Sequence, residues 1–310
     1  MQTFDKLKIV ASIDTIEILN ENAFEKVEHA GGVISLKYYQ EKPFLLVIKV
    51  DLANREVVIE FSGKILGKDY PQLISINTIS KCFQNINDMH ICYIDAEAMM
   101  EGEVVKADYT KDIKGVDTTR LANYIQGHLC NYKAYQSRLL RNGNLIIEKN
   151  VVSKEYKIRM TIYDKQKEMC KTTNKAFIQD NHLEGCFNDT CRVEMNLNSK
   201  EQVRKALKIS DNSLKSVLMS EANPIVDFLN TIIVQEEPRQ CVSSLKSYQT
   251  ELVLKDCDYD LQKVEAKIRS LYPNRGVSIK NKMKPYRAMM ALIDAGNDAD
   301  YWQDILTKLR

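Results

Sequence analysis

A tyrosine closes a row of polar side chains along one predicted strand, and its hydroxyl is a candidate nucleophile. Residues 156–163 alternate strictly, and side chains two apart on a strand share a face. One face is apolar, with Ile158, Met160 and Ile162. The other face carries Lys157, Arg159, Thr161 and Tyr163. A phenol beside cations suits nucleophilic attack on a phosphate.

Two further predicted strands carry carboxylates on one polar face each. The strand at 104–113 groups Lys106, Asp108, Thr110 and Asp112, and the strand at 191–197 turns Arg192, Glu194 and Asn196 away from its apolar side. If these strands are neighbours, their acids meet the tyrosine and its cations on one surface: Asp108, Asp112, Glu194, Tyr163, Lys165 and Arg159. Such carboxylates bind Mg²⁺ or Mn²⁺. The alternative is an antiparallel sheet with one solvated side, which is common for any single strand.

Four short blocks of sequence lie in a fixed order between about residues 56 and 198. They are Glu60-Phe61-Ser62-Gly63-Lys64, Lys106-Ala107-Asp108 with Asp112, Arg159-Met160-Thr161-Ile162-Tyr163-Asp164-Lys165, and Arg192-Val193-Glu194. Their order and spacing resemble the Rep-trans family of plasmid rolling-circle replication initiators and, more distantly, the initiators of filamentous phages. The chain departs from that pattern at Asn196, where family members often have a second acid. It also lacks a His-x-His metal pair, and the Rep-trans type lacks this pair as well.

The resemblance implies a metal-dependent DNA nicking and joining enzyme that starts rolling-circle replication. A tyrosine of such an enzyme becomes joined to the 5′ side of the nicked strand. The resemblance implies Tyr163 as the nucleophile and Asp108, Glu194 and Asp112 as ligands of Mg²⁺ or Mn²⁺. As cations near the phenol, Lys165 and Arg159 are expected to assist catalysis. Lys64, Arg192 and Lys157 are expected to contact DNA. The expected partner is origin DNA, single-stranded or in a hairpin, with a helicase and a second copy of the chain as further candidates. The alternatives are a relaxase-like nickase for DNA mobilisation and a non-catalytic DNA-binding protein that controls replication.

The elements that would position these residues change character along the chain. Residues 1–210 read mainly as strands, with helices expected at 22–29, 68–87 and 117–131. Residues 211–310 read almost entirely as helix. We therefore expect an α+β fold, with an antiparallel-sheet-based nicking domain at 1–210 and a helical C-terminal region at 211–310.

Composition restricts the class of protein without identifying the activity. The 310 residues include 44% hydrophobic and 28% charged residues, and the formal net charge is +2, so DNA binding would depend on local patches. The eight cysteines form no C-x-x-C pair, and the nearest approach to a zinc pattern, at His182, Cys186 and Cys191, fits no zinc class. No apolar run reaches the roughly 18 residues of a membrane span, and no secretory signal is evident. We expect a cytoplasmic protein with no membrane partner.

Overall fold

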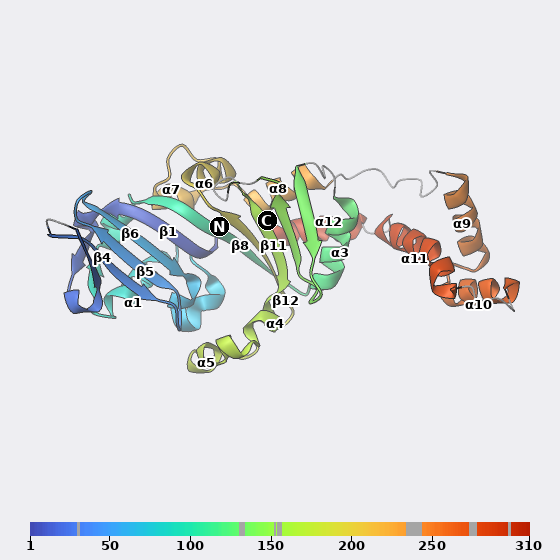
Figure 1. The fold of residues 1–310 in the computed structure, drawn as a ribbon, viewed down its shortest axis with the longest axis horizontal. Coiled ribbons are helices and arrows are strands. Elements are labelled where there is room, and N and C mark those ends of the chain that lie inside the picture. Colours follow the sequence, from blue (N-terminus) through green and yellow to red (C-terminus); the bar gives the residue numbers. More distant parts are fainter. Residues whose placement is uncertain are drawn as a thin grey trace. The chain divides into compact units, whose positions relative to one another are not determined.

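The computed structural model describes residues 1–29, 32–129, 134–151, 153, 157–233, 244–272, 278–296 and 299–310. The chain forms two compact units. Unit 1 comprises Met1–Asn123, Asn131–Ile232 and Leu309–Arg310, and unit 2 comprises Tyr124–Cys130 and Ile233–Lys308. Helices and a large antiparallel sheet occur together, so the expected α+β class is confirmed (Figure 1).

Unit 1 is built on one sheet of ten strands in the order β3-β4-β5-β6-β1-β8-β12-β11-β10-β9, with every neighbouring pair antiparallel. The strands are β1 (Phe4–Ser12), β3 (Glu25–His29), β4 (Gly32–Gln40), β5 (Leu46–Asp51), β6 (Glu56–Ser62), β8 (Glu103–Lys114), β9 (Tyr135–Leu139), β10 (Leu145–Lys149), β11 (Arg159–Asp164) and β12 (Thr190–Leu197). Two short strands, β2 (Ile16–Ile18) and β7 (Cys92–Ile94), pair separately. Alternation of apolar and polar residues located the strands of the large sheet except β3.

The helix expected at residues 22–29 is absent. A short 3₁₀ turn, η2 (Glu21–Ala23), is followed by β3, which pairs with β4 along its whole length. His29 pairs with Gly32, so β3 and β4 form a hairpin where the sequence suggested the end of a helix. Tertiary pairing at the sheet edge therefore overrides the weak helical pattern.

Helices and 3₁₀ segments connect the strands of unit 1. They are η1 (Ile13–Thr15), η3 (Gly63–Gln72), α1 (Ile79–Asn87), α2 (Ala96–Met99), α3 (Thr118–His128), α4 (Lys165–Met169), α5 (Thr172–Asp180), α6 (Lys200–Leu207), α7 (Leu214–Met219) and α8 (Pro224–Ile232), with α3 continuing into unit 2. The helix expected at 68–87 is divided into η3 and α1, because Leu73 has a positive φ of 59° that no helix accommodates. The short α4 and α5 were not anticipated.

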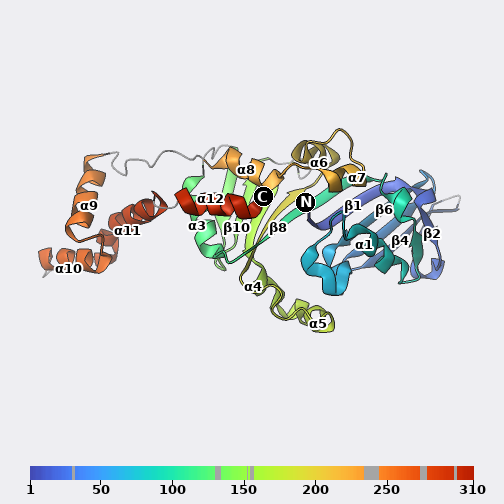
Figure 2. The same ribbon diagram turned by 180° about the vertical axis from the view of Figure 1, so that it is seen from behind.

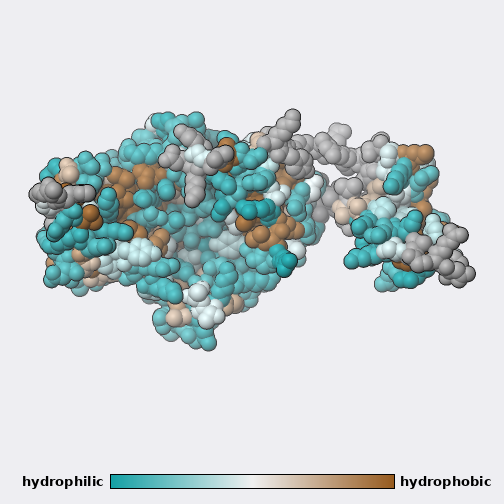
Figure 3. Space-filling model, viewed as in Figure 1, coloured by the Kyte–Doolittle hydropathy of each residue, from teal (hydrophilic) through white to brown (hydrophobic). Residues whose placement is uncertain are grey.

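One face of the sheet carries the main core. Phe61 of β6 packs edge-to-face on Phe83 of α1, with ring centres 6.1 Å apart, and α8 packs against β12. Figure 2 shows α1 lying across this face of the N-terminal strands. The other face carries the charged residues of the sheet, and the side of unit 1 seen in Figure 1 is mostly hydrophilic (Figure 3).

A small second core lies on the polar side of the sheet. It joins η3 to α4, α5 and the loop before β12, through Tyr70, Leu73, Met169, Phe177, Leu183 and Phe187. The ring of Tyr70 packs against those of Phe177 and Phe187, each with its centre 5.6 Å away. We call these segments the cover, because they bury one end of the polar face.

The division between the units lies near residue 232, which corrects the boundary expected at 210. The reason is that α6, α7 and α8 stay with the sheet. The backbone N–H of Val104 donates to the carbonyl of Asn212, and that of Leu214 donates to the carbonyl of Gly102, both at 2.8 Å. A change from strands to helices in the sequence therefore did not mark the end of the folding unit.

Unit 2 is helical. It contains α9 (Leu245–Asp256), α10 (Leu261–Leu271), α11 (Ile279–Gly296) and most of α12 (Ala299–Leu309). The core of α9, α10 and α11 is formed by Leu254, Cys257, Val264, Ile268, Met283 and Met289. Within the described part of the chain, no helix has the length and apolar character needed to cross a bilayer.

Candidate active site

The candidate tyrosine and acids lie on the same face of three adjacent strands, β11, β12 and β8. The cross-strand rows are Tyr163–Arg192–Asp112, Thr161–Glu194–Thr110 and Arg159–Asn196–Asp108. Because residues two apart on a strand share a face, all nine side chains belong to the polar side. Tyr109, the neighbour of Asp108, points into the opposite core, where its ring packs edge-to-face on Phe4. Tyr156, the other tyrosine near this strand, lies outside the described residues.

Tyr163 is nearly buried, with 9% of its surface exposed. Burial, reinforced by the charge of Glu194, raises the pKa of its phenol well above the usual value. The Nζ of Lys165 lies 5.8 Å from the centre of the tyrosine ring. That ammonium is also buried, and it donates to Tyr70 Oη and Glu168 Oε2, both at 2.8 Å. The phenol is therefore protonated at neutral pH, and the cation beside it is already held by other groups.

Arg192 does not lie where DNA can reach it, which corrects its expected role in DNA contact. Its side chain is fully buried, and its Nε and Nη2 donate to the two carboxylate oxygens of Asp112 at 2.6 and 2.8 Å. Its Nη1 donates to Asp5 Oδ1 at 2.8 Å and to Tyr70 Oη at 3.0 Å. Asp112 is thereby committed to a bidentate ion pair, so it is not a free metal ligand either.

Asp5 and Tyr70 belong to this network, although neither stood out in the sequence. The register of β1 against β8 shifts between Phe4 and Lys6, and this bulge brings the adjacent residues Asp5 and Lys6 both to the polar side. Burial opposes ionisation of Asp5, but Arg192 and Lys165 outweigh it and hold its pKa below the usual value. A bulge has no signature in the alternation pattern, so Asp5 could not have been found that way.

Asp108 and Glu194 are the two predicted metal ligands that remain. Burial, followed by the charge of Asp5, raises the pKa of Glu194 to about 7. Burial also raises the pKa of Asp108, against the opposing effect of Lys6, whose Nζ lies 3.6 Å from Asp108 Oδ2. Asn196 stands where the Rep-trans pattern often has a second acid. Its side-chain amide donates to Asp108 Oδ1 at 2.7 Å, so it orients that carboxylate.

The donor chemistry of Asp108 and Glu194 suits a hard divalent cation. Mg²⁺ is often held by one or two carboxylates together with substrate phosphate oxygens and water. Two carboxyl groups whose ionisation is disfavoured, on the same sheet face, fit that arrangement. Across the residues described here, no set of three or more His, Cys, Asp or Glu side chains is arranged to hold a metal ion.

The remaining predicted residues lie around the edge of this site. Arg159 is four residues from Tyr163 on β11, roughly 13 Å along the strand, so it is not the cation beside the phenol. It pairs with Glu148 instead, as does Lys157. Lys64 is half-buried in the cover, where it donates to Asn174 Oδ1 at 2.7 Å, and burial lowers its pKa.

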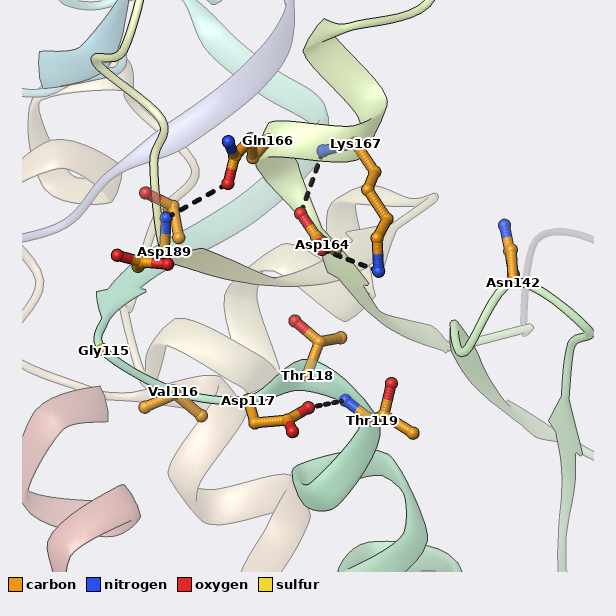
Figure 4. A pocket seen from close by; sticks show the side chains of 11 residues that line it. Gly115, Val116, Asp117, Thr118, Thr119, Asn142, Asp164, Gln166, Lys167 and Asp189 are labelled. Carbon is orange, nitrogen blue, oxygen red and sulfur yellow. Dashed lines mark hydrogen bonds and ion pairs between the residues drawn. The ribbon is translucent and has the colours of Figure 1, made fainter.

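A cavity of about 410 Å³ lies where β8, β11 and β12 meet α3 and α4 (Figure 4). Two of its three acids, Asp117 and Asp164, are helix caps. Asp117 accepts from the backbone N–H of Thr119 at 2.8 Å, and Asp164 accepts from that of Lys167 at 2.9 Å and also pairs with its ammonium. None of the nine predicted site residues lines this cavity.

Comparison with protein-family models, with curated protein sequences and with solved structures finds no match to this chain. The geometry of the polar face and the resemblance of the four sequence blocks are therefore the two observations that bear on function.

Proposed function

We propose that the protein is a metal-dependent DNA nicking and joining enzyme that initiates rolling-circle replication, with Tyr163 as its nucleophile. The observation that carries the proposal is the placement of Tyr163, Glu194 and Asp108 on one face of three adjacent strands. Residues 31 positions apart or more along the chain are brought together there by antiparallel pairing. The expected partner is single-stranded or hairpin origin DNA, with a helicase and a second copy of the chain as further candidates.

In this reaction the phenol oxygen of Tyr163 attacks a backbone phosphorus. A phosphotyrosine forms on the 5′ side of the strand, and the bond to the 3′ oxygen breaks to release a 3′-hydroxyl. Mg²⁺ or Mn²⁺ held by Asp108 and Glu194 would neutralise the phosphate and its developing charge. The bond energy is kept in the phosphotyrosine, so the reverse attack by a 3′-hydroxyl rejoins the strand without ATP.

The chain's own residues meet two requirements of this step. The phenol of Tyr163 must lose its proton, and the acceptor in this proposal is the carboxylate form of Glu194, whose pKa is about 7 and whose charge acts on the phenol; the departing 3′ oxygen takes a proton from water. The phenol must also be held in one orientation, which its burial beside Lys165 and Arg192 provides. Arg192 thus acts on the tyrosine through packing and charge, without touching the DNA.

The near burial of Tyr163 favours a second candidate, a non-catalytic DNA-binding protein that controls replication. A phenol with 9% exposure and a raised pKa is a poor nucleophile unless the substrate or a metal alters its surroundings. A relaxase-like role in mobilisation would use the same chemistry as the first proposal.

Covalent capture separates the enzyme from the binder. Labelled single-stranded oligonucleotides from the DNA flanking the gene are incubated with the full chain and Mg²⁺ or Mn²⁺, then run on a denaturing gel. We expect a protein–DNA adduct that disappears in excess chelator, is unaffected by withholding zinc, and falls by on the order of 10³-fold or more in Tyr163→Phe. Binding by that variant should stay close to wild type, because only one oxygen is lost. Tyr109→Phe is the matched control. If Tyr163→Phe forms the adduct at the wild-type level, Tyr163 is not the nucleophile.

A further inference from the structure

One buried carboxylate on the polar face holds three cations. Glu148 of β10 has a side chain that is 1% exposed. Its Oε1 accepts from Arg159 Nε at 2.6 Å, and its Oε2 lies 2.9 Å from Lys157 Nζ and 3.1 Å from an Nη of Arg138. The three cations come from β9, from β11 and from the segment just before β11. We call these four residues the Glu148 cluster.

The Glu148 cluster has an excess of positive charge, because three cations surround a single carboxylate. One carboxylate balances one cation, so a net charge of about +2 remains on side chains a few ångströms apart, which repel one another. Burial would raise the pKa of Glu148, but Lys157 and Arg159 outweigh it and hold that pKa below its usual value, so the carboxylate stays ionised. An additional anion would therefore stabilise the cluster.

The cations keep donors free for that anion. The side chains of Arg138, Arg159 and Lys157 are 56%, 45% and 28% exposed, while the carboxylate between them is closed off from solvent. A guanidinium has five N–H donors, and Glu148 engages only some of those on each arginine. The free edges match the fork geometry with which arginine binds phosphate.

The Glu148 cluster lies on the same face as the candidate active site. Glu148 is opposite Arg159, and Arg159 is opposite Asn196, the residue that donates to Asp108. Strands β10 and β12 are two strand spacings apart, roughly 10 Å. A strand of DNA with one phosphate near Glu194 would therefore carry neighbouring phosphates toward the cluster.

We propose that Glu148 gathers Arg138, Lys157 and Arg159 into a binding site for the backbone phosphate of a single DNA strand, beside the site of nicking. The inference rests on the proposed function for the identity of the strand. Its chemistry, a phosphodiester held by two arginines and a lysine around a buried acid, stands on the contacts alone. The site reads charge and not sequence, since backbone phosphates are the same at every nucleotide.

The test measures how DNA binding depends on salt. The full chain is titrated, in chelator so that no nicking occurs, with a fluorescent oligothymidylate of about 15 nucleotides over roughly 50–200 mM NaCl. Each lost phosphate contact on a single strand should reduce the slope of log K against log salt by about 0.7, and the affinity at 0.1 M salt by about fivefold. We expect one such step for Arg138→Gln and two for Arg138→Gln/Lys157→Gln. Arg159 remains in both variants to pair with Glu148, which protects folding.

The matched control is Arg204→Gln/Lys205→Gln, which removes two cations that pair with Glu201 on α6. Its slope should stay at the wild-type value. Equal slopes for the control and the double variant, or no binding of the oligonucleotide by the wild type, would overturn the proposal. Adduct formation is scored separately in Mg²⁺. A reduced slope without any adduct supports the phosphate site and rejects the nicking function. An adduct with an unchanged slope supports the nicking function and rejects the phosphate site.

Discussion

The side chain of Arg192 joins three other segments from inside the polar face of the sheet. It bonds Asp112 of β8, Asp5 of β1 and Tyr70 of η3, and none of its surface is exposed. Desolvating a guanidinium is costly, and only full pairing offsets that cost. Within the Arg-x-Glu block of β12, Arg192 is therefore a buried structural residue, whereas Glu194, two positions on, is an acid whose pKa burial raises to about 7.

Arg192→Met should therefore destabilise the fold strongly. The change leaves Asp5 and Asp112 without their cation, and breaking such a pair typically costs about 3–5 kcal/mol. The free energy of unfolding from urea denaturation measures this. Arg204→Met, on the exposed surface of α6, should change it by no more than about 0.5 kcal/mol. A loss for Arg192→Met as small as that of the control would show that the network is not structural.

Glu194 should titrate near pH 7 in the metal-free protein. Its pKa in the folded chain lies above the usual 4.5, so the folded state binds more protons between these values. The contribution of Glu194 to stability is therefore fully present below about pH 4.5 and is lost as the pH rises through about 7. Carbon-detected NMR of the glutamate carboxyl groups measures this pKa directly.

Asp108→Asn supplies the control for that titration. The charge of Asp108 is one of the causes that raise the pKa of Glu194, so its removal should lower that pKa. Glu97→Gln, an exposed change on α2, should leave it in place. A Glu194 pKa that stays near 4.5 in the wild type would mean that the carboxyl is solvated and that the acids do not form a common site.

At the scale of elements, strict alternation revealed the strands of the site but not what covers them. The pattern in β8, β11 and β12 assigned each side chain to the correct face. The pattern gave no information on burial. Arg192 and Tyr163 were therefore expected to be accessible to DNA, whereas in the structure the cover buries them. The cover consists of short segments, η3, α4 and α5, whose stability comes from tertiary packing and not from local periodicity.

The cover depends on a glycine in η3. Gly67 has a positive φ of 57°, and a Cβ there would lie 2.7 Å from Asn181 Oδ1. Asn181 is held in turn, because its Nδ2 donates to the carbonyl of Phe177 at 2.8 Å. An alanine at position 67 therefore strains the backbone and displaces the end of α5.

Gly67→Ala should lower the free energy of unfolding by about 1–3 kcal/mol from the backbone alone, because its φ of 57° and ψ of −119° lie in a region that only glycine adopts readily. Denaturant titration measures the loss. Gly127→Ala is the matched glycine control, because a Cβ there meets no atom within 4 Å and its φ is not positive. That change should be neutral or stabilising by roughly 0.5–1 kcal/mol. Equal effects of the two substitutions on the free energy of unfolding would show that η3 does not need a glycine at position 67.

At the scale of the whole molecule, the ten-stranded sheet has one face that carries the main core and one face that carries charged residues. One face builds the core with α1 and α8, and the other gathers acids at its centre with the Glu148 cluster to one side. Lys6 and Lys8, which pair with Glu60, lie to the other side. Under the proposed function, such an order of charges suits a polyanionic strand that lies across the sheet, with its central phosphate held over Glu194 and Asp108 by the metal ion.

The direct test of the central claim is to find which residue becomes joined to DNA. The adduct formed in Mn²⁺ is digested with nuclease and trypsin, and the modified peptide is sequenced by mass spectrometry. Cleavage after Arg159 and Lys165 yields Met160–Lys165, in which Tyr163 is the sole tyrosine. We expect the deoxynucleotide on Tyr163 of this peptide. A deoxynucleotide on any other peptide, such as Ala107–Lys111 with Tyr109, would contradict the account.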